Sequence, residues 1–195
     1  MAGKGRPLIA LVLLVFLAGY NFSILRQERL LESGQRLVLP LAPLDPRSLL
    51  QGDYMILSFA LERDIRRALE EQAEQLEEKD LAGSFRPPGR GLAVLRLEDG
   101  LGRFIRLHAG EKLQAGEILL EFKYRGNGNF RISSGAYFFE EGLAELYDQA
   151  RYAELRVAPS GRALIKSLLD QEGETLRKPI PPEASPPQPP APPER

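Results

Sequence analysis

The sequence predicts an α+β fold in which an N-terminal transmembrane helix precedes one domain with a mainly antiparallel β-sheet and two or three helices. Three features indicate this fold: an uncharged apolar segment near the N-terminus, several short segments of alternating apolar and polar residues, and one stretch with helical periodicity. The 195 residues leave room for a single globular domain between two unusual ends.

The N-terminal segment predicts a membrane anchor. Residues 7–25 include no charged side chain, and a helix of that length spans about 28 Å, close to the hydrocarbon thickness of a bilayer. Lys4 and Arg6 precede the segment, which favours an N-terminus inside the cytoplasm. A cleaved signal peptide is disfavoured because Ala18 and Gly19 each have a bulky residue two positions earlier. A buried core helix is the third alternative.

We therefore expect a single-pass protein of the cytoplasmic (inner) membrane, with its domain outside the cytoplasm and the lipid bilayer as a partner through residues 7–25. The expected organisation is a short basic tail at 1–6, the anchor at 7–25, an α+β domain at 26–172 and a Pro-rich tail at 173–195. Nine of the 16 prolines lie in the last 17 residues, so we expect this tail to be extended.

Composition narrows the classes of function. A net charge of -1, from 26 Lys and Arg against 27 Asp and Glu, gives no reason to expect a nucleic-acid partner. The absence of cysteine excludes disulfides, thiolate nucleophiles and thiolate metal sites. Because His108 is the single histidine, a His-rich metal site is excluded. We expect its side chain to be exposed. We expect no metal and no cofactor.

Alternating patterns predict the strands of the domain. In the segment from Asp53 to Leu61, the side chains of Met55, Leu57 and Phe59 share one apolar face with Leu61, so this face should be core. The expected strands are Gln35–Leu41, Asp53–Leu61, Leu92–Leu97, Arg103–Leu107, Glu117–Tyr124, Phe130–Ile132, Ala136–Phe139 and Glu154–Ala158. A turn at 126–129 should join two of them.

Helical signals predict fewer elements. Asp45 as N-cap, Pro46 at the first helical position and Gly52 as C-cap indicate a short helical turn before the second strand. A longer helix is expected at 62–80, with an apolar stripe formed by Ile65, Leu69, Ala73 and Leu76. Two further helices are expected at 142–150 and at 162–171.

A motif then identifies a known family. The residues Gly52-Asp53-Tyr54-Met55-Ile56-Leu57-Ser58-Phe59 resemble the Gly-Asp-Tyr-x-x-Leu-x-Tyr motif that names the GDYXXLXY family. The segment Asp45-Pro46-Arg47-x-Leu49-Leu50, the segment from Tyr137 to Gly142 and the segment from Ala150 to Val157 also resemble that family, over about residues 7 to 170. Phe59 stands where the family name has Tyr, so this chain departs from the family pattern by the loss of that hydroxyl.

The resemblance implies a location and a shape, and it implies no reaction. The family consists of membrane-anchored bacterial proteins of uncharacterised function, often associated with multi-pass membrane proteins, which makes such a protein the expected partner. Residues of the matching segments are the candidate motif and interaction residues: Asp45, Pro46, Arg47, Gly52, Asp53, Tyr54, Leu57, Phe59, Tyr137, Phe138, Phe139, Glu140, Gly142, Arg151 and Tyr152. We assign no catalytic residue, and expect an accessory or scaffold protein that is not an enzyme.

The sequence leaves three alternative functions. The Gly52-Asp53 region also resembles membrane-bound signal peptidases, but Leu44 occupies the nucleophile position and Ser48 is displaced by four residues. A hydrolase of the cell envelope would use Asp53 with Glu140 or Glu141. A ligand-binding sensor would hold its ligand inside the sheet. The aromatic residues from Tyr137 to Phe139 are the candidate interaction surface, and their alternative role is in the core.

Overall fold

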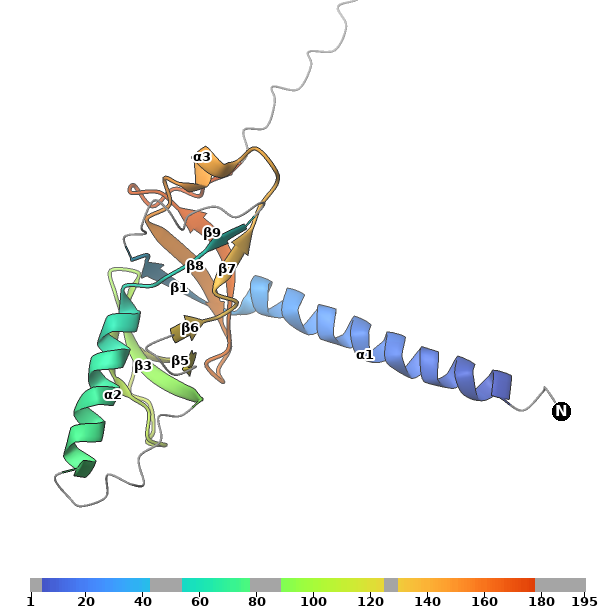
Figure 1. The fold of residues 1–195 in the computed structure, drawn as a ribbon, viewed down its shortest axis with the longest axis horizontal. Helices are drawn as coiled ribbons and strands as arrows, with labels where there is room; N and C mark the ends of the chain where they lie inside the picture. Colours follow the sequence, from blue (N-terminus) through green and yellow to red (C-terminus); the bar gives the residue numbers. More distant parts are fainter. Residues whose placement is uncertain (1–4, 43–53, 78–88, 125–129, 178–195) are drawn as a thin grey trace, which may run out of the picture.

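The computed structural model describes residues 5–42, 54–77, 89–124 and 130–177. A long helix, α1 (Gly5–Ser33), extends from a domain made mostly of strands (Figure 1). The domain contains α2 (Leu61–Glu77) and the short α3 (Ala144–Tyr147). The strands are β1 (Gln35–Pro40), β2 (Tyr54–Ile56), β3 (Arg90–Glu98), β4 (Leu101–Leu107), β5 (Glu117–Tyr124), β6 (Phe130–Ile132), β7 (Ala136–Phe138), β8 (Tyr152–Val157) and β9 (Ala163–Leu169).

Seven strands form one sheet in the order β6-β5-β3-β4-β1-β8-β9, and β2 pairs with β7 in a separate two-stranded ribbon. The expectation of a mainly antiparallel sheet needs correction, because β1 runs parallel to β4 and the sheet is mixed and nearly barrel-like. The parallel pairing is possible because β1 and β4 are not joined by a tight turn. The chain passes through β2, α2 and β3 between them. The first strand therefore lies inside the sheet instead of at its edge.

The sheet is curled, and hydrogen bonds join its two ends. The backbone N–H of Glu121 on β5 donates a hydrogen bond to the carbonyl of Gly161, in the β8–β9 turn, at 2.8 Å. The hydroxyl of Ser133, after β6, donates to the carbonyl of Ala163 at 2.9 Å. Gly161 has a φ of +86°, and a Cβ there would lie 2.8 Å from Leu92 Cδ2, so glycine permits both the turn and the close approach.

Apolar side chains of the strands fill the interior of the curled sheet. Leu37 and Leu39 from β1, Leu95 from β3 and Leu120 from β5 are fully buried. Alternation along β5 turns Ile118, Leu120 and Phe122 inward and leaves Glu121 and Lys123 on the outer face. Burial of these side chains is the main favourable contribution to folding.

The apolar face predicted around the motif is confirmed. Met55, Leu57, Phe59 and Leu61 are all buried in the core. The predicted strand is shorter than expected, because β2 ends at Ile56 and α2 begins at Leu61. Phe59 instead forms an isolated bridge with Leu41, next to the end of β1.

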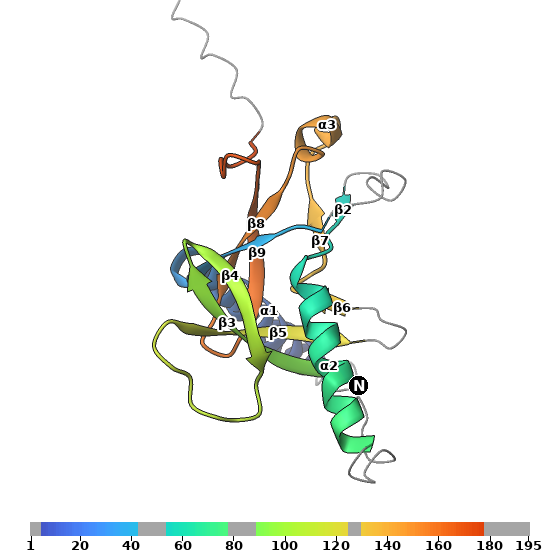
Figure 2. The ribbon, with the colours of Figure 1, turned by 90° about the vertical axis from the view of Figure 1, so that its left-hand side faces the viewer.

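The helix α2 covers the domain on the side away from α1 (Figures 1 and 2). Two residues of its predicted stripe, Ile65 and Leu69, are buried, and Ala73 is half-buried. Arg67 and Glu71 on the opposite face form an ion pair at 3.0 Å, as expected for positions four apart. The side chain of Leu76 and residues 78–80 lie outside the described part of the chain.

Two expected helices are wrong in kind or in length. The segment predicted as a helix at 162–171 is the strand β9. The local sequence of β9 is compatible with a helix or a strand, because its apolar residues fit both periods. Pairing with β8 selects the strand. The helix predicted at 142–150 is reduced to α3. The helical turn expected before Gly52, the turn expected at 126–129 and the Pro-rich tail beyond residue 177 lie outside the described residues.

The helix α1 continues beyond the predicted anchor and leads directly into the sheet. Its segment Leu11–Ser33 has the length and composition to cross a membrane, and its side chains are not buried against the domain. Only Gly34 separates α1 from β1, and its N–H donates to the Leu30 carbonyl at 2.9 Å. The Arg156 guanidinium on β8 donates to the Gly34 carbonyl at 3.2 Å, which fixes the junction.

An ionic cluster fastens the long connection between β4 and β5. Arg106 donates two hydrogen bonds to the Glu117 carboxylate, at 2.7 and 3.1 Å, and Glu117 has only 1% of its side chain exposed. These bonds, followed by one from the Gln114 N–H at 2.9 Å, lower the pKa of Glu117 to about 2. His108, expected to be exposed, is 16% exposed, because it packs beside Glu111 with Nδ1 3.4 Å from the carboxylate.

Substitution of Gly102 by alanine should destabilise the fold. A Cβ at this position would overlap Cδ1 of Leu37 and lie 2.9 Å from Cδ2 of Leu39, both in the packed core. We expect the free energy of unfolding to fall by about 1–3 kcal/mol, measured by urea unfolding of the detergent-solubilised full chain. Gly89→Ala, where a Cβ meets nothing within 4 Å, is the control and should change it by less than about 0.5 kcal/mol. Equal effects of the two substitutions would contradict the packing at Gly102.

Substitution of Glu117 by glutamine should change the pH dependence of stability. The pKa of Glu117 falls from the usual 4.5 to about 2 on folding, so its contribution is present above pH 4.5 and is lost as the pH falls toward 2. Glu117→Gln should lower stability at pH 7 and flatten the decline between pH 4.5 and 2 in urea-unfolding measurements. Glu71→Gln, in an exposed ion pair, is the control. An unchanged decline in Glu117→Gln would refute this role.

Candidate functional site

The two-stranded ribbon of β2 and β7 places residues from two of the motif segments side by side. Tyr54 pairs with Phe138, and Met55 pairs with Tyr137. Because alternate residues point to opposite faces, Met55 is buried while the outer face carries Tyr54, Ile56 and Phe138. The rings of Tyr54 and Phe138 lie 5.6 Å apart, and Phe138 is 72% exposed and Ile56 50% exposed. We call Tyr54, Ile56 and Phe138 the ribbon surface.

A second aromatic group lies beneath the ribbon, around Tyr147 of α3. Its ring centroid is 5.4 Å from that of Tyr137 and 4.9 Å from that of Phe139. Tyr147 is buried, while Tyr137 and Phe139 are half-buried. Burial, and then the nearby Tyr147, raise the pKa of Tyr137 to about 12, so its phenol stays neutral at physiological pH. Tyr137 and Phe139 therefore pack partly into the core, whereas Phe138 does not.

The remaining described candidates have local roles in the chain. Gly142 adopts a φ of +84° in the turn before α3. The guanidinium of Arg151 donates to the carbonyls of Ala150 at 2.9 Å and Asp148 at 3.2 Å. Tyr152 begins β8 between β1 and β9, opposite Pro40 and Leu169.

Glu140 lines a cavity of about 490 Å³ that also includes Tyr137, Tyr147, Glu154 and Lys166. Glu141 is exposed in the turn before α3. Asp45, Pro46, Arg47, Gly52 and Asp53 lie outside the described residues, so the pairing of Asp53 with Glu140 or Glu141 has no geometry here.

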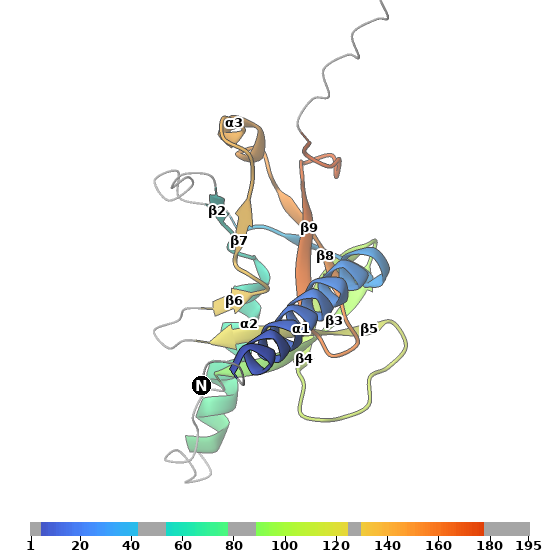
Figure 3. The ribbon, with the colours of Figure 1, turned by 90° about the vertical axis from the view of Figure 1, so that its right-hand side faces the viewer.

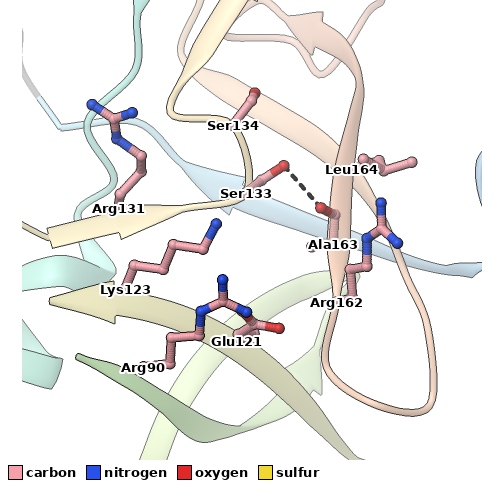
Figure 4. A pocket seen from close by; sticks show the side chains of 9 residues that line it. All are labelled: Arg90, Glu121, Lys123, Arg131, Ser133, Ser134, Arg162, Ala163 and Leu164. Atoms are coloured by element: carbon pink, nitrogen blue, oxygen red, sulfur yellow. Dashed lines mark hydrogen bonds and ion pairs between the residues drawn. The ribbon is translucent and has the colours of Figure 1, made fainter. Parts of the chain in front are cut away.

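A second site lies on the outer face of β5. Arg90 of β3 pairs with Lys123 of β5, and Lys123 pairs with Arg131 of β6, so three cations form one row across three strands. Arg162, at the start of β9, adds a fourth cation to the same hollow (Figure 4). Glu121 is the carboxylate of this lining, and its Oε1 lies 3.8 Å from Arg90. The hollow has a volume of about 420 Å³.

Two serines close one side of this hollow, which we call the cationic pocket (Arg90, Glu121, Lys123, Arg131, Ser133, Ser134, Arg162, Ala163 and Leu164). Ser133 has a φ of +56°, an uncommon conformation for a residue with a side chain. Its hydrogen bond to Ala163 joins the β6–β7 turn to β9 and so builds the wall of the pocket (Figure 4). Ser134 donates to the carbonyl of Ala136 at 2.7 Å.

The comparison with known proteins agrees with the motif segments around the ribbon. The family model described as GDYXXLXY protein matches residues 16–168, which include α1 from Phe16 onward and nearly all of the folded domain. The chain belongs to the GDYXXLXY family. No curated protein and no solved structure matches it.

Within this GDYXXLXY chain, part of the name-giving motif builds the fold. Leu57 and Phe59 are core residues, and the backbone N–H of Phe59 donates to the Glu62 carboxylate at the start of α2 at 3.3 Å. Burial raises the pKa of Glu62, and the bond to Phe59 opposes that rise. Tyr54 and Ile56 are the described residues of the motif segment that contribute to the ribbon surface.

The cationic pocket was not predicted from the sequence. Its cations, at 90, 123, 131 and 162, come from four separate segments of the chain, and each belongs to an ordinary alternating strand or turn. The signal becomes visible only when the register of β3, β5 and β6 is known, because that register places three like charges directly opposite one another.

The two groups of aromatic residues should respond differently to truncation. Tyr147→Ala removes a buried ring and should lower the free energy of unfolding by about 3 kcal/mol. Phe138→Ala removes a ring that is 72% exposed and should lower it by less than about 0.5 kcal/mol. Urea unfolding of both variants tests this expectation. A large loss of stability in Phe138→Ala would show that the ribbon surface is structural instead of available for contact.

Proposed function

We propose that this protein is a single-pass accessory protein of the cytoplasmic membrane, whose domain outside the cytoplasm binds an integral membrane protein through the ribbon surface. The proposal rests on the apolar helix α1, on its direct junction with the sheet, and on the exposure of apolar side chains in the ribbon. It concerns binding and assigns no reaction.

The junction supports a partner at the membrane surface. The first charged residue after the apolar segment is Arg26, and the helix continues to Ser33. These eight residues rise about 12 Å in a helix, which is enough to cross a lipid headgroup layer of about 5–8 Å. Because Gly34 alone separates α1 from β1, the domain stays close to the bilayer and near the parts of integral proteins that project from it.

The ribbon surface supports contact with a protein. Aromatic and large apolar residues are enriched at the centres of protein interfaces, where they contribute most of the binding energy. Phe138 packs on Tyr54 but remains largely exposed, so its ring gives little to the fold. The exposure of Phe138 is the observation that carries the proposal. A single exposed ring is common on proteins and is weak evidence by itself. Tyr54 and Ile56 strengthen the argument because they lie beside Phe138 and form one apolar patch with it.

Site-specific photo-crosslinking tests the proposal. A benzophenone amino acid replaces Phe138 in the full chain, expressed in its native membranes, and the same amino acid replaces Ile105, an exposed residue of β4, as a control. We expect irradiation to give an adduct at position 138 and none at 105, with a partner that mass spectrometry identifies as a protein with several membrane-spanning segments. Phe138→Asp should reduce recovery of that partner at least about tenfold after extraction in mild detergent.

Two outcomes would refute the proposal. The first is an absence of any adduct at position 138 while the chain is in the membrane fraction. The second is an adduct made only with another copy of the chain, which would show that the ribbon surface is a self-association surface.

A further inference from the structure

We propose that the cationic pocket is a binding site for a phosphate group, carried by an anionic lipid headgroup or present as free phosphate. The inference goes beyond the proposed function, because the pocket and the ribbon surface share no residue and recognise different chemistry. Four observations carry it: the register of the cations, the lack of a described carboxylate partner at Lys123, Arg131 and Arg162, the donors that remain, and the position of the pocket relative to α1.

The register of the cations is costly for the fold. Arg90, Lys123 and Arg131 occupy directly opposite positions on three neighbouring strands. Opposite positions bring side chains within about 5 Å at Cβ, and like charges placed there destabilise a sheet. Elsewhere on β3 and β5 the charges of opposite residues are complementary. Arg96 lies opposite Glu117, and its guanidinium is 3.7 Å from the carboxylate oxygen Oε1. The row of three cations is therefore a local exception to the way this sheet places charge.

Among the described residues, one carboxylate reaches the row. Glu121 reaches Arg90 at 3.8 Å. Across the described ranges 5–42, 54–77, 89–124 and 130–177, no carboxylate oxygen lies within 4.0 Å of Lys123, Arg131 or Arg162. An anion bound among these side chains would offset their repulsion.

The donors that remain suit a phosphate group. The hydroxyls of Ser133 and Ser134 already donate to backbone carbonyls, so the available donors are the guanidinium groups and the ammonium group. An arginine offers a planar fork that matches phosphate oxygens, and a lysine adds a compact charge. A phosphate accepts hydrogen bonds at several oxygens and can therefore engage several of these side chains at once. At about 420 Å³, the hollow also leaves room for a group attached to the phosphate.

The position of the pocket favours a headgroup as one source of the phosphate. Figure 3 views the domain from the side to which α1 projects, and β5, β6 and β9, which contribute to the pocket, are visible around that helix. The helix α2 lies farther from the viewer. If α1 crosses a bilayer, this face of the domain is turned toward the headgroups. Anionic headgroups attract clustered Lys and Arg at short range.

The first experiment measures thermal unfolding of the detergent-solubilised full chain in inorganic phosphate and in chloride at equal ionic strength. A ligand bound only by the folded state raises the melting temperature, and we expect a saturable rise on the order of 5 °C at a large excess of phosphate. The double variant Lys123→Gln/Arg131→Gln should lose this rise. In chloride it should melt above the parent chain, because the repulsion within the row is relieved.

The matched control is Arg63→Gln/Arg67→Gln, which removes the same charge from the exposed face of α2. This control should keep the phosphate-dependent rise. A purely structural role of the row would give the opposite result in chloride, a lower melting temperature for Lys123→Gln/Arg131→Gln.

The second experiment distinguishes the two sources. The full chain is placed in nanodiscs of phosphatidylcholine, with or without phosphatidic acid, and its melting temperature is measured with and without dissolved phosphate. A rise that depends on phosphatidic acid and on Lys123 and Arg131 assigns the site to a lipid headgroup. A rise with dissolved phosphate alone assigns it to free phosphate.

The inference is overturned if neither form of phosphate raises the melting temperature, or if the rise persists in Lys123→Gln/Arg131→Gln. Loss of the phosphate site would leave the crosslink at Phe138 intact, and loss of that crosslink would leave the phosphate-dependent rise intact. The two proposals therefore fail independently.

Discussion

The position of β1 in the middle of the sheet is the constraint on which the rest of the structure depends. This strand follows α1 after a single glycine, yet it lies between β4 and β8 and contributes two fully buried leucines. The tether is therefore continuous with the hydrophobic core, and the guanidinium of Arg156 holds the junction from the neighbouring strand. No flexible linker separates α1 from the sheet, so the fold sets the direction in which the helix leaves the domain.

Both candidate sites arise where the sheet departs from regular pairing. The strands β2 and β7 leave the main sheet and pair with each other, which exposes one face of a short ribbon with the rings of Tyr54 and Phe138. Where the main sheet closes on itself, the β8–β9 turn approaches β5 at Gly161, and Ser133 donates a hydrogen bond to Ala163. This closure leaves the cationic pocket between β6 and β9. The side chains between the paired strands form the core, whereas the exposed aromatic rings and the cationic pocket lie where the pairing of the main sheet ends.

Local patterns predicted the strands well where alternation was clear. The apolar face from Met55 to Leu61 and the alternation of β5 were both recognised, because burial on one side of a strand imposes a period of two on the sequence. The segment 162–171 was assigned to a helix, although it forms β9, because its apolar residues fit either period and pairing with β8 decides the outcome. The parallel contact of β1 with β4 left no mark in local sequence, since it depends on the path of the intervening chain.

The sequence by itself determined the apolar N-terminal segment, the family and the aromatic residues around Tyr137, because each is a property of contiguous residues. Only the tertiary structure decided which of those aromatic rings are exposed, since neighbouring residues of β7 point to opposite faces. It also decided that cations from four separate segments share one hollow. Electrostatic repulsion and attraction act through space, so a cluster whose members come from separate strands between residues 90 and 162 becomes apparent only after the strands have paired.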